Sequence, residues 1–185
     1  MGQSVLIEQY REMHVDESIF PGDSLTQHAP SIKQLIDSTG SKTLLDYGCG
    51  KGYQYTKLNL HDEYFKGIMP SLYDPGTKYS DFPEGEFDGV FCTDVLEHIE
   101  EQDLDAVLDQ IYSKAKKFVY LGVCTVPAQA ILPDGRNAHV TIKPFAWWLE
   151  KVLPFAKVGT QLYCYGDNKC VARIENNNIS FRKER

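Results

Sequence analysis

The sequence predicts a single α/β domain built on an open sheet whose main strands are parallel. Three apolar runs carry this prediction, at 43–45, 87–93 and 118–126, and each is long enough for one buried strand. The first run ends at an acid and alternating glycines, which is typical of the ligand-binding corner of an open α/β sheet. A chain of 185 residues suits one domain with a full-sized core.

The first 40 residues are expected to form a helical lid or cover ahead of the sheet. Apolar residues at helical spacing predict one helix over 5–13 and another over 26–38, which stops at Gly40. Pro30 marks a late start or a kink in the second helix. As a lid, this part of the chain would face the ligand with Tyr10, Met13, His14 and Phe20. The alternative is that both helices only cover the sheet.

A glycine turn after the first strand is the predicted ligand-binding corner. The strand runs into Asp46 and then into alternating glycines at Gly48, Gly50 and Gly52. Glycine permits a tight turn and lets a ligand approach the backbone. A helix expected over 53–60 would point its free N–H groups at the same place. A turn without any ligand remains the alternative.

The spacing in this turn separates three classes of ligand. A phosphate-binding loop needs Ser or Thr after its lysine, but Gly52 follows Lys51, and a dinucleotide fingerprint needs a third glycine where Tyr53 stands. The carboxylate of Asp46 repels pyrophosphate but can pair with a cation such as an α-ammonium group. The pattern D-x-G-x-G-x-G resembles the first motif of class I S-adenosylmethionine-dependent methyltransferases, which implies a ligand with an amino-acid tail.

A second carboxylate is expected at the end of the next strand. That strand is predicted over 65–74, irregular or at a sheet edge because of Pro70. In nucleoside-binding α/β sheets, an acid at this point accepts both ribose hydroxyls and follows the glycines by about 20 residues, as Asp74 follows Gly52. Asp74 is therefore the predicted ribose ligand. The alternative is that it only initiates a turn with Pro75.

The strand over 87–93 runs into a block that also resembles those methyltransferases, in which "FD-x-V" and "D-V-L-E-H" recur at this place. Ligands occupy the carboxyl edge of an open sheet, so Asp94 and His98 are candidates for contact with cofactor or acceptor. The alternative for His98 is a capping or packing role. Before this strand there is room only for a third strand of a few residues around 79–82, which leaves the adenine contact open.

The segment 127–142 leaves the same sheet edge after the strand at 118–126. It carries two donors and an imidazole, Arg136, Asn137 and His139, and loops at this edge commonly carry function. We predict that Arg136 and Asn137 bind the acceptor. An ordinary Asp-Gly turn is the alternative.

The remaining elements complete the fold. Helices are expected over 103–117 and from 144 to 154, where Trp147 faces away from the buried stripe and toward the acceptor. Strands over 157–165 and 169–174 would form a closing antiparallel hairpin. A hairpin of this kind on a parallel sheet also resembles the methyltransferase fold and departs from the dehydrogenase one.

The resemblance covers roughly 43–174 and implies a Rossmann-like methyltransferase domain. It implies a seven-stranded, mostly parallel sheet with a C-terminal antiparallel hairpin and helices on both faces. The expected units are the lid or cover at 1–40, a cofactor-binding core at 41–175, and a polar, loose tail at 176–185. The implied cofactor is S-adenosyl-L-methionine, with S-adenosyl-L-homocysteine as product. The predicted cofactor-binding residues, including those of the lid, are Tyr10, His14, Asp46, Tyr47, Gly48, Cys49, Gly50, Gly52, Asp74 and Asp94.

The implied reaction is in-line methyl transfer to an oxygen or nitrogen of a small-molecule acceptor. The methyl group of a sulfonium is already activated, so positioning in a dry pocket provides most of the acceleration. A base is needed only if the acceptor loses a proton, and the candidate catalytic residues are His139, His98 and Asp94. Glu97, His98 and His139 lack metal-ligand spacing, so no metal site is predicted. The alternatives are methylation of RNA or protein with a partner, a cofactor-binding module without catalysis, and a nucleotide-dependent oxidoreductase, which the glycine pattern disfavours.

Composition bounds the partners. A net charge of −7 and a pI near 5.2 argue against a broad basic face for nucleic acid or an anionic membrane. No apolar run has the length of a membrane span, and no signal peptide is recognised, so a cytoplasmic protein is expected. The five cysteines are odd in number and lack metal-ligand spacing, which predicts buried free thiols. The oligomeric state is not predicted.

Overall fold

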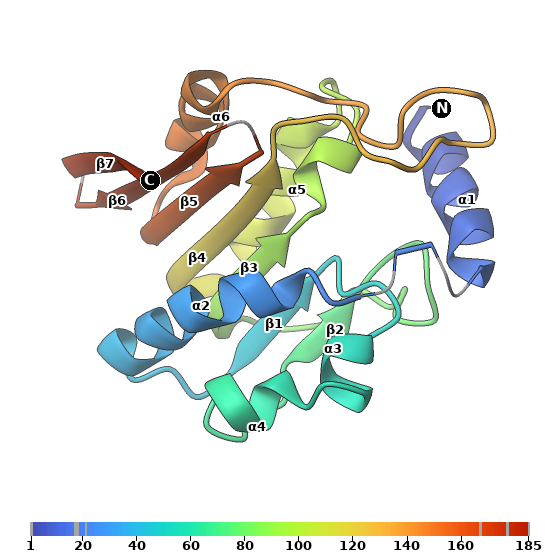
Figure 1. Ribbon diagram of the computed structural model, residues 1–185. Helices are drawn as coiled ribbons and strands as arrows, with labels where there is room; N and C mark the ends of the chain where they lie inside the picture. Colours follow the sequence, from blue (N-terminus) through green and yellow to red (C-terminus); the bar gives the residue numbers. More distant parts are fainter. Residues whose placement is uncertain (1, 17–18, 21, 167, 177, 185) are drawn as a thin grey trace.

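The computed structural model describes residues 2–16, 19–20, 22–166, 168–176 and 178–184, which form a seven-stranded sheet with helices on both faces (Figure 1). The strands follow the order β2-β1-β3-β4-β5-β6-β7 across the sheet. Their bounds are β1 (Leu44–Tyr47), β2 (Ser71–Tyr73), β3 (Phe87–Thr93), β4 (Ala115–Cys124), β5 (Gly159–Tyr165), β6 (Lys169–Glu175) and β7 (Asn178–Glu184). Strands β1 to β5 are parallel, whereas β6 and β7 pair antiparallel, which confirms the predicted fold class.

The helices divide into two layers and one outlying element (Figure 1). Their bounds are α1 (Gly2–Val15), α2 (Leu25–Thr39), α3 (Tyr53–Thr56), α4 (Leu60–Tyr64), η1 (Leu96–His98), α5 (Leu104–Ser113), α6 (Phe145–Val152) and η2 (Leu153–Phe155). Helices α2, α3 and α4 cover one face of the sheet, and α5 and α6 cover the other. Helix α2 contains Pro30 and stops at Gly40, whose φ of 60° is left-handed, as the sequence predicts.

The core follows the alternation of side chains along the parallel strands. Leu45 and Val90 belong to the core beneath α5 and α6, whereas their neighbours Leu44 and Phe91 belong to the core beneath α2 and α4. All four are buried, as expected for central strands that are covered on both faces. A third, smaller cluster joins α1 to the loop 127–142. Helix α1 therefore packs on a loop at the carboxyl edge and not on a face of the sheet.

Two predicted helices differ from the structure. The helix expected over 53–60 is broken into α3 and α4, because Asn59 adopts a left-handed conformation with φ 53° that asparagine tolerates. The helix expected over 103–117 ends at Ser113, because Ala115 already belongs to β4. Its apolar spacing continues into the strand, where burial on the sheet determines the conformation.

Three strand predictions also need correction. No third strand forms around 79–82, since β3 pairs directly with β1 and all of 74–86 is described. The second strand is only the three residues of β2, although it lies at the sheet edge as predicted. The tail expected to be loose forms β7, an edge strand paired along β6. Asp167, in the predicted hairpin turn, lies outside the described residues.

The structure bears on two predictions made from composition, the absence of a membrane span and the burial of the cysteines. Within the described ranges, no helix combines the length and the apolar character needed to cross a membrane. The cysteines are free, and four of the five are buried, which confirms the expected buried thiols. The five are Cys49, Cys92, Cys124, Cys164 and the half-buried Cys170.

Candidate functional site

The glycine turn between β1 and α3 is shaped by close packing. Gly48 has φ 87°, and its N–H donates to the carbonyl of Tyr73 at 2.7 Å. A Cβ atom on Gly48 would lie 2.1 Å from Cγ2 of Val95, which follows β3. Because no real Cβ contact is this short, glycine is required here by the fold itself, before any ligand is considered.

We therefore expect Gly48→Ala to lower the free energy of unfolding by about 2 kcal/mol, from overpacking against Val95 and from the left-handed φ. Chemical denaturation followed by circular dichroism measures this loss. In the double variant Gly48→Ala/Val95→Ala, the overlap is removed, and about half of the loss should be recovered relative to Val95→Ala alone. Equal losses in both backgrounds would show that the contact with Val95 is not the cause.

Asp74 joins the glycine turn to the end of β2. Its Oδ2 accepts from the N–H of Gly50 at 2.9 Å, and its Oδ1 accepts from the N–H of Gly76 at 2.8 Å. Burial raises the pKa of Asp74, while the two N–H donors and the nearby His14 oppose this shift. A carboxylate oxygen has two acceptor positions, so each oxygen can still accept a hydroxyl hydrogen bond.

Asp46 lies beneath the turn and is held by α3. Its Oδ2 accepts from the hydroxyl of Tyr55 at 2.7 Å and from Nε2 of Gln54 at 3.1 Å. The side chain is 2% exposed, and burial raises its pKa to about 7 despite these hydrogen bonds. Gln54 also donates to the carbonyl of Cys49 at 2.9 Å, so this group fixes the turn from below.

The side chains of Tyr47 and Cys49 are directed into the protein. The Tyr47 hydroxyl donates to Oε1 of Gln110 on α5 at 2.7 Å, and its ring packs edge-on against Tyr73. Cys49 is 2% exposed, and burial raises the pKa of its thiol well above the usual range. Both residues therefore present their backbone, and not their side chains, to a ligand at the turn.

Helix α1 and residues Asp16 and Ile19 lie over the glycine turn. The ring of His14 is so close that a Cβ atom on Gly50 would be 3.8 Å from its Cε1. Burial lowers the pKa of His14, and its Nδ1 is a buried polar atom without a hydrogen-bond partner among the described residues. Lys51 of the turn donates to the carbonyls of Asp16 and Ile19 at 2.6 and 2.9 Å. Asp16 and Ile19 are thus attached to the turn by hydrogen bonds.

A cluster of aromatic side chains connects α1 with η1. The ring of His98 packs edge-on against Tyr10, Phe20 and His139, with centroid distances of 5.2, 5.7 and 4.8 Å. Nδ1 of His98 donates to the carbonyl of Ala138 at 2.9 Å, since a carbonyl can only accept. Burial and the neighbouring His139 lower the pKa of His98 to about 4. The imidazole is therefore neutral near pH 7, with its lone pair on Nε2.

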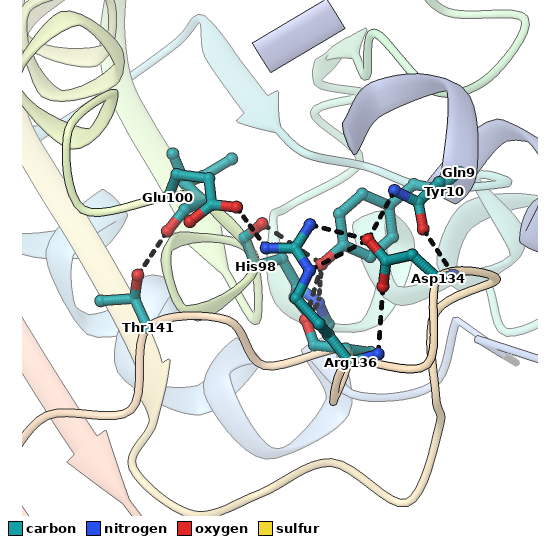
Figure 2. Close-up of polar contacts among 9 residues, drawn as sticks. Gln9, Tyr10, His98, Glu100, Asp134, Arg136 and Thr141 are labelled. Atoms are coloured by element: carbon teal, nitrogen blue, oxygen red, sulfur yellow. Dashed lines mark hydrogen bonds and ion pairs between the residues drawn. The ribbon is translucent and has the colours of Figure 1, made fainter. Parts of the chain in front are cut away.

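The polar side chains of the loop 127–142 bind one another and α1 (Figure 2). Arg136 pairs with Asp134 at 2.9 Å and with Glu100 at 2.5 Å, while Gln9 of α1 donates to Asp134 at 3.0 Å. The amide of Asn137 is bound on both sides by the backbone of this loop. The predicted acceptor-binding groups Arg136 and Asn137 thus hold the loop in shape.

Asp94 is held by residues that the sequence interpretation did not single out. It has a left-handed φ of 57°, and its Oδ1 accepts from the hydroxyl of Tyr165. Nε2 of the fully buried His28 lies 3.6 Å from its Oδ2. Although burial raises the pKa of Asp94, the facing imidazole of His28 and the hydrogen bond from Tyr165 lower it below the usual value overall. His28 lies next to Ala29 of the buried stripe of α2. This position was the sequence signal that could have identified His28 as a buried polar residue.

Trp147 lies apart from these groups. On α6, it packs against the core beneath that helix and edge-on against Trp148 at 5.1 Å. Nζ of Lys143 lies 5.1 Å from its ring centroid. The structure thus brings Tyr10, His14, Gly50, Asp74 and His98 toward one edge, and it places Trp147 on a different layer.

The chain is similar to known methyltransferases. The profile of a family described as a methyltransferase domain matches residues 25–153, from the start of α2 to the start of η2. The chain is similar to the crystal structure of a SAM-dependent methyltransferase from Archaeoglobus fulgidus, with 20% identity and a TM-score of 0.44. That similarity covers 84% of this chain and 77% of the other. None of the curated proteins matches the chain.

Proposed function

The chain belongs to the methyltransferase domain family, and from this premise we propose that it transfers a methyl group from S-adenosylmethionine to an oxygen or nitrogen of a small-molecule acceptor. The observation that carries the choice of cofactor is the position of Asp74. Its carboxylate lies at the end of β2, bound to Gly50 of the glycine turn. This is the place where nucleoside-binding α/β sheets hold a ribose.

The residues of the turn fit such a cofactor. Asp74 would accept the two ribose hydroxyls, and the backbone of Gly48 and Gly50 would lie against the amino-acid end. Nδ1 of His14 is a buried polar atom that still needs a partner at this place. Asp46 would act indirectly, because its Oδ2 is already bound by Gln54 and Tyr55.

The bound cofactor supplies a methyl group that is already activated, so the protein has to position the acceptor and exclude water. Helix α1, with His14 close to Gly50, and residues Asp16 and Ile19, to which Lys51 donates, lie over the glycine turn and would keep water out. Where the acceptor has to lose a proton, Nε2 of His98 or of His139 would take it, because Nδ1 of each ring donates to a backbone carbonyl. Asp94 would hold the carboxyl end of β3 in place through its contact with His28 and its hydrogen bond from Tyr165.

Calorimetric titration of S-adenosylhomocysteine into the protein tests the cofactor, with NAD as the control ligand. We expect one site for S-adenosylhomocysteine and no heat of binding for NAD. Transfer of a labelled methyl group from S-adenosylmethionine to a pool of small metabolites then tests the acceptor class. Binding of NAD alone would overturn the proposal. Cofactor binding without transfer to the pool, but with transfer to RNA or protein, would overturn the acceptor class.

A further inference from the structure

A carboxylate, a thiol and an imidazole meet beyond the carboxyl ends of β3 and β4. They belong to Glu97 of η1, Cys124 at the end of β4, and His139 of the loop 127–142. A carboxylate oxygen, Sγ and a ring nitrogen of these residues all lie within 4.8 Å of one another. Because three separate segments contribute, no spacing in the sequence announces this group.

Glu97 is the least satisfied member of the group. Its side chain is 0% exposed, and its Oε1 accepts from the N–H of Cys124 at 2.8 Å. Its Oε2 is buried and has no hydrogen-bond partner among the described residues. A buried carboxylate oxygen without a partner is costly, so this position calls for a cation or another donor.

His139 is oriented as metal-binding histidines are. Its Nδ1 lies 2.5 Å from the carbonyl oxygen of Val126 and must donate to it, so the lone pair is on Nε2. A hydrogen bond from the second ring nitrogen to a carbonyl is the usual way in which a protein fixes the tautomer of a metal ligand. The backbone N–H of His139 also donates to Asn137 at 2.9 Å, which holds the residue in place.

We propose that Glu97, Cys124 and His139 bind a divalent metal ion of the zinc class. A thiolate and an imidazole favour Zn²⁺ over Mg²⁺ or Ca²⁺. Tetrahedral Zn²⁺ holds its ligand atoms about 3.3–3.8 Å apart, so the group would contract by about 1 Å on binding. Thiolate and carboxylate together balance the charge of the ion, and three protein ligands leave its fourth position open to water or another small ligand. The site needs neither cofactor nor acceptor, but it shares His139 with the proposed function: with the ion bound to Nε2 of His139, only His98 is left as the candidate base.

Cobalt substitution tests the proposal on the full, untagged chain. The protein is first stripped with a chelator, and Co²⁺ is then titrated in while the absorption spectrum is recorded. We expect one equivalent to produce both a tetrahedral visible band and a thiolate-to-cobalt charge-transfer band, and Zn²⁺ to abolish them. Zn²⁺ should also raise the melting temperature of the stripped protein. A wild-type spectrum without the charge-transfer band, or binding of less than half an equivalent, would overturn the proposal and favour a bound water.

Variants locate the ion. Cys124→Ser should lose the charge-transfer band and weaken Zn²⁺ binding about 100-fold or more, whereas the matched control Cys164→Ser, in a buried thiol of neighbouring β5, should retain both. Glu97→Gln keeps an acceptor for the N–H of Cys124 but removes a negative ligand, so it should also weaken binding. If Cys124→Ser fails to fold, the Zn²⁺ affinity of His139→Gln decides, because His139 is only half-buried and its replacement disturbs the fold less. Equal losses in Cys124→Ser and Cys164→Ser would contradict the assignment.

Discussion

Replacing Asp74 with asparagine is expected to weaken the binding of S-adenosylhomocysteine by about 100-fold or more, because two charge-assisted hydrogen bonds to a ribose are lost at about 1.5–3 kcal/mol each. Asparagine has one acceptor oxygen, whereas the carboxylate accepts from both Gly50 and Gly76. The amide group would therefore place a donor against one of these N–H groups. Titration calorimetry of wild type and Asp74→Asn measures the change in affinity.

The control for this variant is Asp109→Asn, which removes the same charge from an exposed position on α5, away from the glycine turn. Its affinity should stay within about 3-fold of wild type, because an exposed charge outside the site contributes little. Melting curves of both variants establish that each is folded. Unchanged affinity in a folded Asp74→Asn variant would show that the ribose is held elsewhere, whereas the proposed methyl transfer itself would remain open to the transfer assay.

The parts of the fold that follow from local pattern were predicted well. Strand β3 has the predicted bounds, because an apolar run flanked by polar turns specifies a buried strand by itself. Gly40 ends α2 as expected, since only its own backbone conformation is involved. Strand β7 was missed, because its polar sequence is stabilised by pairing with β6 at the sheet edge. Such pairing depends on the partner strand and leaves little trace in the segment itself.

In the candidate site, too, the residues that belong to a local pattern were predicted, and those that depend on contacts between distant segments were not. The glycine turn and Asp74 were found from a motif and a spacing, and the structure joins them by a hydrogen bond. The contacts of Asp94 with His28 and Tyr165 were not foreseen, because they join a helix near the N-terminus to a strand near the C-terminus. The loop 127–142 was singled out for its polar side chains, but whether these bind one another or a ligand depends on tertiary contacts.

Wild-type stability is expected to fall as pH rises from 5 to 8 because of Asp46. Its pKa is about 7 in the folded protein, against about 3.9 for an unfolded aspartate, so the folded state binds the proton more tightly between these values. The resulting stability is fully present below the unfolded pKa and is lost as pH rises through the folded one. The loss from this residue between pH 5 and pH 8 is about 3 kcal/mol.

Asp46→Asn separates this contribution from those of other buried acids. Asparagine keeps an oxygen that accepts from Gln54 and Tyr55 but has no proton to lose in either the folded or the unfolded state, so the variant should be more stable than wild type at pH 8 by about 4 kcal/mol. At pH 5 the unfolded aspartate is already ionised while the folded one is protonated, so the advantage of the variant should be only about 1.5 kcal/mol, changed by up to about 1 kcal/mol for the altered hydrogen bond. Urea denaturation of both proteins at several pH values measures the difference. A constant difference across this range would mean that Asp46 is ionised throughout, and that Gln54 and Tyr55 stabilise its charge more than burial opposes it.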